Sequence, residues 1–174
     1  NNEKFEEVTW GSTKAGSDKR ILEKYPKTKK ILLDKFKKVA LEDYKYENDF
    51  IITTSWLTKT SKDQSGFLHC HKNSFYSGVY YFDEYADKSS PITFQSPLQQ
   101  FYDFEVTPSE FNMQNSSLWE IYPRKNLLLF FPSYLQHFIK LNNNEMDRYS
   151  LAFNIAPIGS YGYGDSTYNT SWFN

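Results

Sequence analysis

Residues 127–141, with the sequence LLLFFPSYLQHFIKL, give the clearest indication of the fold class. The apolar run Leu127–Phe131 turns through a Pro-Ser pair into a second apolar run, Leu135–Leu141. Short apolar runs that end at Pro and Ser are typical of strands rather than of helices. The stretch therefore predicts two successive β-strands.

Similar short runs recur on both sides of this stretch. They are Phe50–Thr58, Phe67–His71, Phe75–Phe82, Ile92–Gln95, Phe101–Val106, Leu118–Tyr122 and Tyr149–Ile155. Aromatic residues make up 19% of the chain, which suits pleated, half-buried strands. Roughly eight strands of this length, separated by Gly, Pro, Asn and Ser, favour a sandwich or a jelly roll. We therefore predict a mainly β protein.

The two ends of the chain differ from this pattern. From Ser17 to about Tyr44, apolar residues recur at helical spacing, with Ser17 a suitable N-cap and Pro26 dividing two helices. Residues 159–165 (GSYGYGD) are typical of a loop, whose aromatic side chains either fold back over the mouth of the jelly roll or stay mobile.

The length of 174 residues suits one domain with a sizeable core and is short for two. We expect a single domain over residues 1–174. It comprises a helical preface (1–48), a jelly-roll core (49–156) and a tail (157–174).

Charge and cysteine content exclude several classes of protein. The lysines crowd the N-terminal part, but Glu23 and Asp34 lie among them, which favours a solvated helix face over a nucleic-acid surface. The single cysteine excludes an intramolecular disulfide framework. No apolar stretch approaches the length of a membrane span or opens the chain like a secretory signal. We expect a cytoplasmic protein that contacts no membrane.

The three histidines of the chain are the candidate metal-binding residues. His69 and His71 lie two positions apart at the end of a predicted strand, so both point to one face. His137 follows the strand and turn described above and is expected to face the interior. Histidine is a common ligand of mid-row transition metals. The alternative is a set of hydrogen-bonded histidines without a metal.

The run RYSLAFNI, residues 148–155, follows these histidines and alternates as a strand. Arg148 and Ser150 share one of its faces. The order His-x-His, His137, Arg148-x-Ser150 resembles that of the 2-oxoglutarate/iron(II) oxygenase superfamily. In that superfamily a double-stranded β-helix carries an early His-x-Asp/Glu, a late His and a late Arg-x-Ser.

Three segments, residues 69–81, 131–137 and 148–155, look more closely like oxygenases of phages and bacteria that are similar to prolyl hydroxylases. The resemblance covers roughly Phe50 to Ile155 and implies a double-stranded β-helix. It also implies the use of Fe(II), 2-oxoglutarate as co-substrate and O2, in the cytoplasm of a bacterium or a phage-infected host.

The resemblance implies a metal site with one departure from the superfamily. The carboxylate expected two residues after the first histidine is replaced by His71 if His69 is the first ligand, and by Asn73 if His71 is the first. Three-histidine iron sites are chemically feasible. We favour His71 and His137 as ligands, with His69 as the third.

The resemblance also implies roles around the co-substrate. Arg148 would meet the distal carboxylate of 2-oxoglutarate, because a guanidinium fork matches a carboxylate, and Ser150 would add a hydrogen bond. Val79 and Tyr81 alternate inward on the strand after the histidines, residues 78–82. This strand resembles the prolyl-hydroxylase pattern, in which a tyrosine reaches the same carboxylate. No catalytic residue beyond the metal ligands is expected.

Three further side chains carry weaker expectations. Trp56 and Trp119 either line the pocket or belong to the core. Cys70 faces away from the metal by strand alternation, and a structural role is the default for it.

The substrate is open at this stage. A polypeptide side chain is favoured, with a prolyl residue as the leading case, and a small molecule is the alternative. The polar loops Ser61–Gly66 and Pro108–Ser117 are long enough to border a peptide groove.

Two other classes of function compete with the oxygenase reading. One is a cupin-like three-histidine metalloenzyme, either a thiol dioxygenase or an isomerase. The other is a non-catalytic jelly-roll binding module. The sequence does not indicate an oligomeric state.

Overall fold

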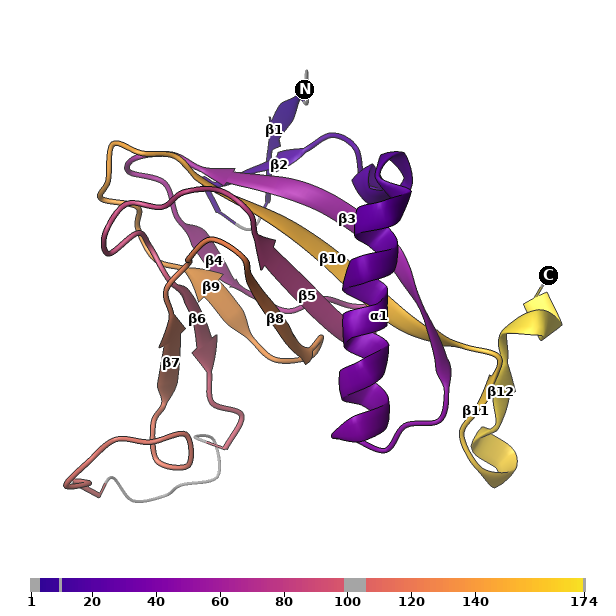
Figure 1. The fold of residues 1–174 in the computed structure, drawn as a ribbon. Helices are drawn as coiled ribbons and strands as arrows, with labels where there is room; N and C mark the ends of the chain where they lie inside the picture. The colour runs from indigo at the N-terminus through magenta and orange to yellow at the C-terminus, as the bar shows by residue number, and fades with distance from the viewer. Residues whose placement is uncertain (1–3, 10, 99–105, 174) are drawn as a thin grey trace.

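The computed structural model describes residues 4–9, 11–98 and 106–173. Two antiparallel sheets face each other (Figure 1), a larger one of order β1-β2-β3-β10-β5-β8 and a smaller one of order β4-β9-β6-β7. The strands are β1 (Phe5–Glu7), β2 (Lys14–Gly16), β3 (Asp49–Thr60), β4 (Gly66–His69), β5 (Tyr76–Tyr81), β6 (Ile92–Gln95), β7 (Leu118–Ile121), β8 (Leu127–Pro132), β9 (His137–Ile139) and β10 (Arg148–Ile158). Successive strands from β3 to β10 mostly change sheet, which is the arrangement of a jelly roll and confirms the predicted fold class.

The predicted strands of the core, apart from Phe101–Val106, correspond to strands of the structure but differ from them by up to three residues at their ends. The prediction Phe67–His71 included His71, whereas β4 ends at His69. Leu135–Leu141 was predicted as a strand, but β9 begins only at His137, because Leu135 N–H bonds the Pro132 carbonyl at 3.0 Å and closes a turn. Of the predicted strand Phe101–Val106, residues 101–105 lie outside the described residues, and Val106 is in no strand.

The N-terminal region contains one α-helix, α1 (Pro26–Glu42), and a short 3-10 helix, η1 (Ile21–Lys24). Pro26 stands at the start of α1, where its missing N–H needs no partner. The expectation that Ser17 caps a helix is wrong, since Ser17 N–H bonds the Lys4 carbonyl next to the end of β2.

The preface is not helical throughout, because strands β1 and β2 pair with each other and β2 continues the larger sheet beside β3. The helical spacing of the sequence begins only after these strands. The pairing of β2 with β3 joins Ala15 to Thr58, far apart in the sequence. Periodicity within a short window carries no signal for such a contact.

Helix α1 lies across the outer face of the larger sheet, as Figure 1 shows. It buries Leu32, Phe36 and Ala40, spaced four residues apart on one face of the helix. The Phe36 ring packs against Phe50 and Phe130 with ring centroids 5.1 and 5.3 Å apart. These residues belong to a core between α1 and the larger sheet, which is separate from the core between the two sheets.

The second core fills the space between the two sheets. Its buried members are Val79, Tyr81, Ile92, Phe94 and Phe131. They come from β5, β6 and β8, so both sheets contribute to it. The candidate site lies beside this core.

The tail forms a hairpin, β11 (Ser160–Tyr161) with β12 (Tyr168–Asn169), together with the 3-10 helices η3 (Gly164–Ser166) and η4 (Thr170–Phe173). In Figure 1 the hairpin extends beyond the end of β10 rather than folding over the space between the sheets. None of the described helices is both long and apolar enough to cross a membrane.

Candidate metal centre

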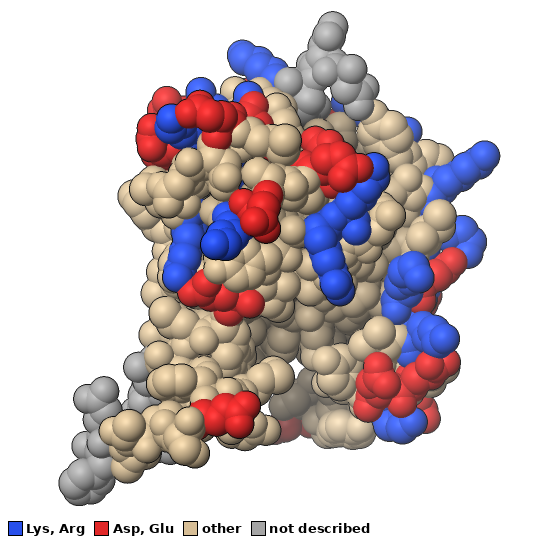
Figure 2. Space-filling view, turned by 60° about the vertical axis from the view of Figure 1, so that its left-hand side comes forward, with Lys and Arg blue, Asp and Glu red and all other residues tan. Residues whose placement is uncertain are grey.

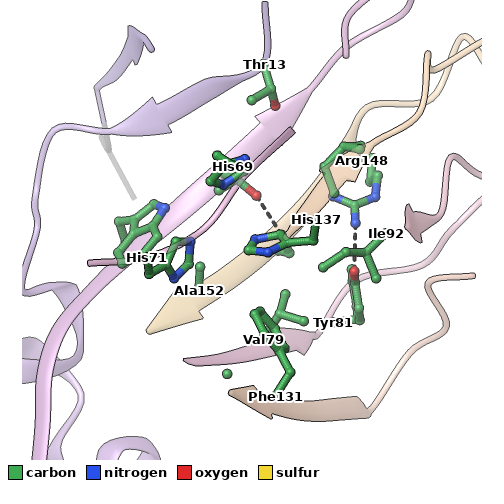
Figure 3. A pocket seen from close by; sticks show the side chains of 15 residues that line it. Thr13, His69, His71, Val79, Tyr81, Ile92, Phe131, His137, Arg148 and Ala152 are labelled. Atoms are coloured by element: carbon green, nitrogen blue, oxygen red, sulfur yellow. Dashed lines mark hydrogen bonds between the residues drawn. The ribbon is translucent and has the colours of Figure 1, made fainter. Parts of the chain in front are cut away.

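The three histidines come together at the edge of the smaller sheet, where β4 ends and β9 begins (Figure 3). His69 and His137 are directly paired across the two strands. His71 lies two residues beyond β4, where its N–H bonds the Ser133 carbonyl at 2.9 Å. One ligand atom from each ring lies within 4.8 Å of the others. The folded chain thus assembles the three predicted histidines into a single cluster.

Asn73, the other candidate for a third ligand, is placed differently. It is exposed and adopts a left-handed backbone conformation with φ of 55°, as residues in tight turns do. It lines an outer cleft with Phe75 and Tyr46, whereas the three histidines line the pocket between the sheets. This placement favours His69 over Asn73.

Burial keeps the three rings neutral. Desolvation lowers the pKa of His137 to about 3 and that of His71 to about 4, and it also lowers the pKa of His69. A positive imidazolium is disfavoured where water is excluded, so the proton is lost more readily. Metal ligation requires the neutral ring. The site is therefore in the correct protonation state at pH 7.

Backbone carbonyls orient two of the rings. His69 Nδ1 lies 2.8 Å from the Phe67 carbonyl oxygen, and His137 Nδ1 lies 2.9 Å from the Leu135 carbonyl oxygen. Because a carbonyl oxygen only accepts, Nδ1 carries the proton in both neutral rings and Nε2 keeps its lone pair. This is the tautomer in which Nε2 binds a metal. Three neutral imidazoles form a donor set that suits divalent iron.

Arg148 occupies the inner end of the same pocket. Its side chain is 1% exposed. Its Nε donates to the Ser90 carbonyl at 2.9 Å and one terminal nitrogen donates to the Tyr81 hydroxyl at 2.7 Å. Ser150 lies beside it, with its hydroxyl 2.6 Å from that of Thr58. The three predicted co-substrate residues therefore line one pocket with the histidines.

The Arg148 guanidinium forms no ion pair with an acidic side chain among the described residues. Its hydrogen-bond partners are a carbonyl and a hydroxyl, and no ion pair of the described residues includes it. A buried unpaired cation is costly, so such a group calls for an anion. A guanidinium also carries more N–H donors than these two bonds use. The inner end of the pocket is suited to a carboxylate.

Trp56 and Trp119 have different surroundings. Trp56 lines the pocket and meets the His71 ring edge to face, with centroids 5.5 Å apart. Trp119 packs against the core between the sheets and does not line the pocket. Cys70 is a free, partly buried thiol that also does not line it. Of the three, only Trp56 touches the site.

Several polar residues of the site were missed in the sequence. Asn154 and Ser77 contact the His71 ring, and Thr13 lines the pocket from the segment before β2. Asn154 lies an even number of residues after Arg148 in the same strand, so strand alternation was a signal that could have indicated its place on the inner face. No pattern in the sequence pointed to Thr13, because its place depends on the pairing of β2 with β3.

Comparisons with known proteins bear directly on this site. A family model described as "Putative 2OG-Fe(II) oxygenase" matches residues 54–154, which is more than half of the chain. The matched residues include the three histidines, Arg148 and Ser150. Comparison with curated proteins finds no match to this sequence.

Solved structures share the fold at low sequence identity. An oxidoreductase of the 2OG-Fe(II) oxygenase family from Burkholderia pseudomallei is 12% identical, with a TM-score of 0.62 over 89% of this chain and 74% of that one. HygX from Streptomyces hygroscopicus, solved with nickel and 2-oxoglutarate, is 13% identical, with a TM-score of 0.60 over 90% and 74%. A prolyl-4-hydroxylase from Pseudomonas putida is 12% identical, with a TM-score of 0.56 over 90% and 79%.

The likeness to these structures agrees with the jelly-roll fold, and the family match extends over the residues that build the pocket. The chain therefore belongs to the 2-oxoglutarate- and iron(II)-dependent oxygenases.

Proposed function

We propose that His69, His71 and His137 hold iron(II) in this oxygenase. The observation that carries the proposal is the cluster of three neutral rings beside a buried arginine that has no anionic partner among the described residues. A metal held by three protein ligands keeps further coordination positions for its substrates. A metal-free histidine cluster would leave this arrangement without a role.

Arg148 is the proposed anchor for the distal carboxylate of 2-oxoglutarate. The Tyr81 hydroxyl and the Ser90 carbonyl hold the guanidinium in place before any ligand arrives. Ser150 adds a hydroxyl on the same face of β10. Because the guanidinium is buried, a carboxylate that reaches it exchanges water for a charge-assisted hydrogen bond in a medium of low dielectric constant.

When bound, iron(II) with 2-oxoglutarate and O2 supplies oxidative decarboxylation to succinate and carbon dioxide, coupled to hydroxylation of a substrate C–H bond. The chain positions the reactants and excludes water. Val79, Ile92 and Phe131 line the pocket with apolar surface. An apolar pocket lining excludes water and so limits unproductive side reactions with the solvent.

A prolyl residue of a polypeptide is the proposed substrate. The resemblance of residues 78–82 to prolyl hydroxylases supports it, as does the shared fold of the Pseudomonas putida enzyme. On the face in Figure 2, Lys and Arg lie interspersed with Asp and Glu instead of forming a basic stripe. A surface of mixed charge disfavours nucleic acid as the substrate.

A small molecule is the second candidate substrate. HygX, which shares the fold, has been solved with hygromycin B bound. Mass spectrometry separates the two candidates after incubation of the iron-loaded enzyme with proline-rich peptides, free proline and a host lysate. A gain of one oxygen on a peptide is expected. Oxygen that appears only on free small molecules would reject the polypeptide proposal and leave the oxygenase assignment in place.

The site chemistry has its own test, an anaerobic titration with iron(II) and 2-oxoglutarate. Chelation of the metal by 2-oxoglutarate produces a charge-transfer absorption in the visible range, which we expect here. Iron binding without this absorption would favour a cupin-like three-histidine enzyme. Absence of iron binding at micromolar concentration would favour a non-catalytic binding module.

We further propose that residues 1–174 act as one oxygenase domain in the cytoplasm of a bacterium or a phage-infected host. The packing of α1 on the larger sheet and the pairing of β2 with β3 support a single unit. The single cysteine suits a reducing compartment.

A further inference from the structure

The ring of His71 is held differently from the other two rings of the cluster. His69 and His137 bond a backbone carbonyl two residues earlier in the chain. His71 Nδ1 instead lies 2.8 Å from Asn154 Oδ1 and 2.7 Å from Ser77 Oγ. Side chains from β10 and β5 therefore set the orientation of this ring.

The hydrogen bonds around Asn154 define which of its atoms faces the ring. Asn154 Nδ2 donates to Thr54 Oγ1 at 3.0 Å, which directs Oδ1 toward His71. The Ser77 hydroxyl has one proton and two acceptors for it, the same Oδ1 at 2.9 Å and Ser133 Oγ at 2.8 Å, because Ser133 donates its own proton to Ser74. With either acceptor the Ser77 oxygen faces the ring with a lone pair. Both neighbours of His71 Nδ1 then accept. The proton of the neutral ring must lie on Nδ1, and Nε2 keeps its lone pair.

We propose that Asn154 is a positioning residue of the metal centre, which fixes His71 in the tautomer that presents Nε2 to the metal. This inference rests on the proposed metal site. The amide oxygen of Asn154 can only accept, whereas the Ser77 hydroxyl that remains without it can also donate to Nδ1. Without Asn154, the ring proton can therefore move to Nε2 and block ligation. Groups that fix ligand tautomers in this way typically contribute a factor of about 10–100 to metal affinity.

The serine side chains behind Asn154 form the rest of the support. Ser77 and Ser133 are fully buried, and their hydroxyl oxygens are 2.8 Å apart. Ser133 donates to Ser74 at 2.8 Å, and Ser74 donates to the Tyr76 carbonyl at 3.0 Å. These bonds tie the His71 support to the backbone of β5. The acceptor is therefore held in place before a metal binds.

The first test uses the metal-free protein and so does not depend on the metal site. Long-range ¹H–¹⁵N spectra of histidine-labelled protein report which ring nitrogen carries the proton. We expect His71 to be protonated on Nδ1 in the wild type and to lose this preference in Asn154→Leu. A wild-type His71 protonated on Nε2 would overturn the inference while leaving the cluster intact.

The second test is a titration with cobalt(II), followed by its visible absorption. Asn154→Leu is expected to bind cobalt(II) about 10–100-fold more weakly. Asn154→Asp keeps an acceptor oxygen and should bind at least as tightly as the wild type. Thr93→Val is the control, because it also removes a buried polar group, one that has no hydrogen-bond partner among the described residues and lies outside the pocket. It should bind cobalt(II) like the wild type.

The outcomes separate the two proposals. A wild type that binds no cobalt(II) rejects the metal site, whatever the tautomer of His71. A wild type that binds, together with an Asn154→Leu variant of equal affinity, rejects the role of Asn154 alone. If Asn154→Leu does not fold, the wild-type tautomer and the Asn154→Asp titration still decide, and weaker binding by Asn154→Asp overturns the inference.

Discussion

The Arg148 guanidinium donates a hydrogen bond of 2.7 Å to the Tyr81 hydroxyl and lies 5.0 Å from the centre of the same ring. Both side chains are almost completely buried. Burial and the adjacent Arg148 act in opposite directions on the Tyr81 hydroxyl, and burial dominates, so its pKa is raised and it stays protonated. Tyr81 thus orients the cation without neutralising it, and the charge of Arg148 remains available to a ligand.

Replacing Arg148 should separate co-substrate binding from metal binding. Arg148→Ala is expected to raise the 2-oxoglutarate concentration for half-maximal decarboxylation by orders of magnitude, because removing one partner of a buried charged pair costs roughly 3–5 kcal/mol. Cobalt(II) affinity should be retained, which also reports that the variant is folded. Arg124→Ala removes an exposed arginine and is the control. An unchanged requirement for 2-oxoglutarate would contradict the assignment.

The Tyr81 hydroxyl should contribute a smaller part of the same affinity. Tyr81→Phe keeps the ring but leaves an N–H of Arg148 without its acceptor, which costs about 1–3 kcal/mol in a buried site. We expect 2-oxoglutarate to bind roughly tenfold more weakly, as measured by anaerobic titration. Tyr85→Phe removes a hydroxyl that donates to the Tyr149 carbonyl at 2.7 Å and serves as the control. Equal affinities of the two variants would argue against a role for Tyr81.

Loss of His137 should abolish metal binding. This ring is 4% exposed, and the described residues that line the pocket include no His, Cys, Asp or Glu beyond the three histidines to replace it. His137→Ala is expected to show no cobalt(II) spectrum and no decarboxylation of 2-oxoglutarate. Cys70→Ala changes a neighbour of the cluster that does not line the pocket, and it should bind cobalt(II) normally. Stoichiometric iron in His137→Ala would disprove the ligand assignment.

The metal-free protein should lose stability in mild acid. The pKa values of His71 and His137 fall from 6.5 to about 4 and about 3 on folding, so below pH 6.5 the unfolded chain binds protons that the folded chain does not. Stability is therefore lost as the pH falls, by about 1 kcal/mol per pH unit for each histidine. Urea unfolding between pH 7 and pH 5 measures this slope. His137→Ala should show a shallower slope, and an identical slope would contradict the prediction.

Gly78 should resist substitution for reasons of packing alone. A Cβ at this position in β5 would lie 2.2 Å from the ring of Phe153, which is fully buried under α1. Gly78→Ala is therefore expected to destabilise the protein by roughly 1–3 kcal/mol. Phe153→Leu removes the ring, so Gly78→Ala should cost less in that background. Additive effects in denaturant unfolding would show that the two residues do not compete for space.

Local patterns in the sequence were sufficient to predict the strands of the core and the candidate residues of the site. Alternation along a strand is a local property, so it placed Arg148 and Ser150 on one face, and Val79 and Tyr81 on another, without knowledge of the fold. The turn after residue 131 likewise directed His137 inward. The structure agrees, since all five residues line the pocket.

The contacts between distant parts of the chain became known only from the folded structure. The pairing of His69 with His137, the contact of Asn154 with His71 and the addition of β2 to the larger sheet join residues far apart in sequence. Such contacts depend on the register between strands, which no local pattern specifies. The choice between His69 and Asn73 as third ligand also depended on a feature that no local pattern specifies. The path of the chain after β4 turns His71 into the pocket and Asn73 out of it.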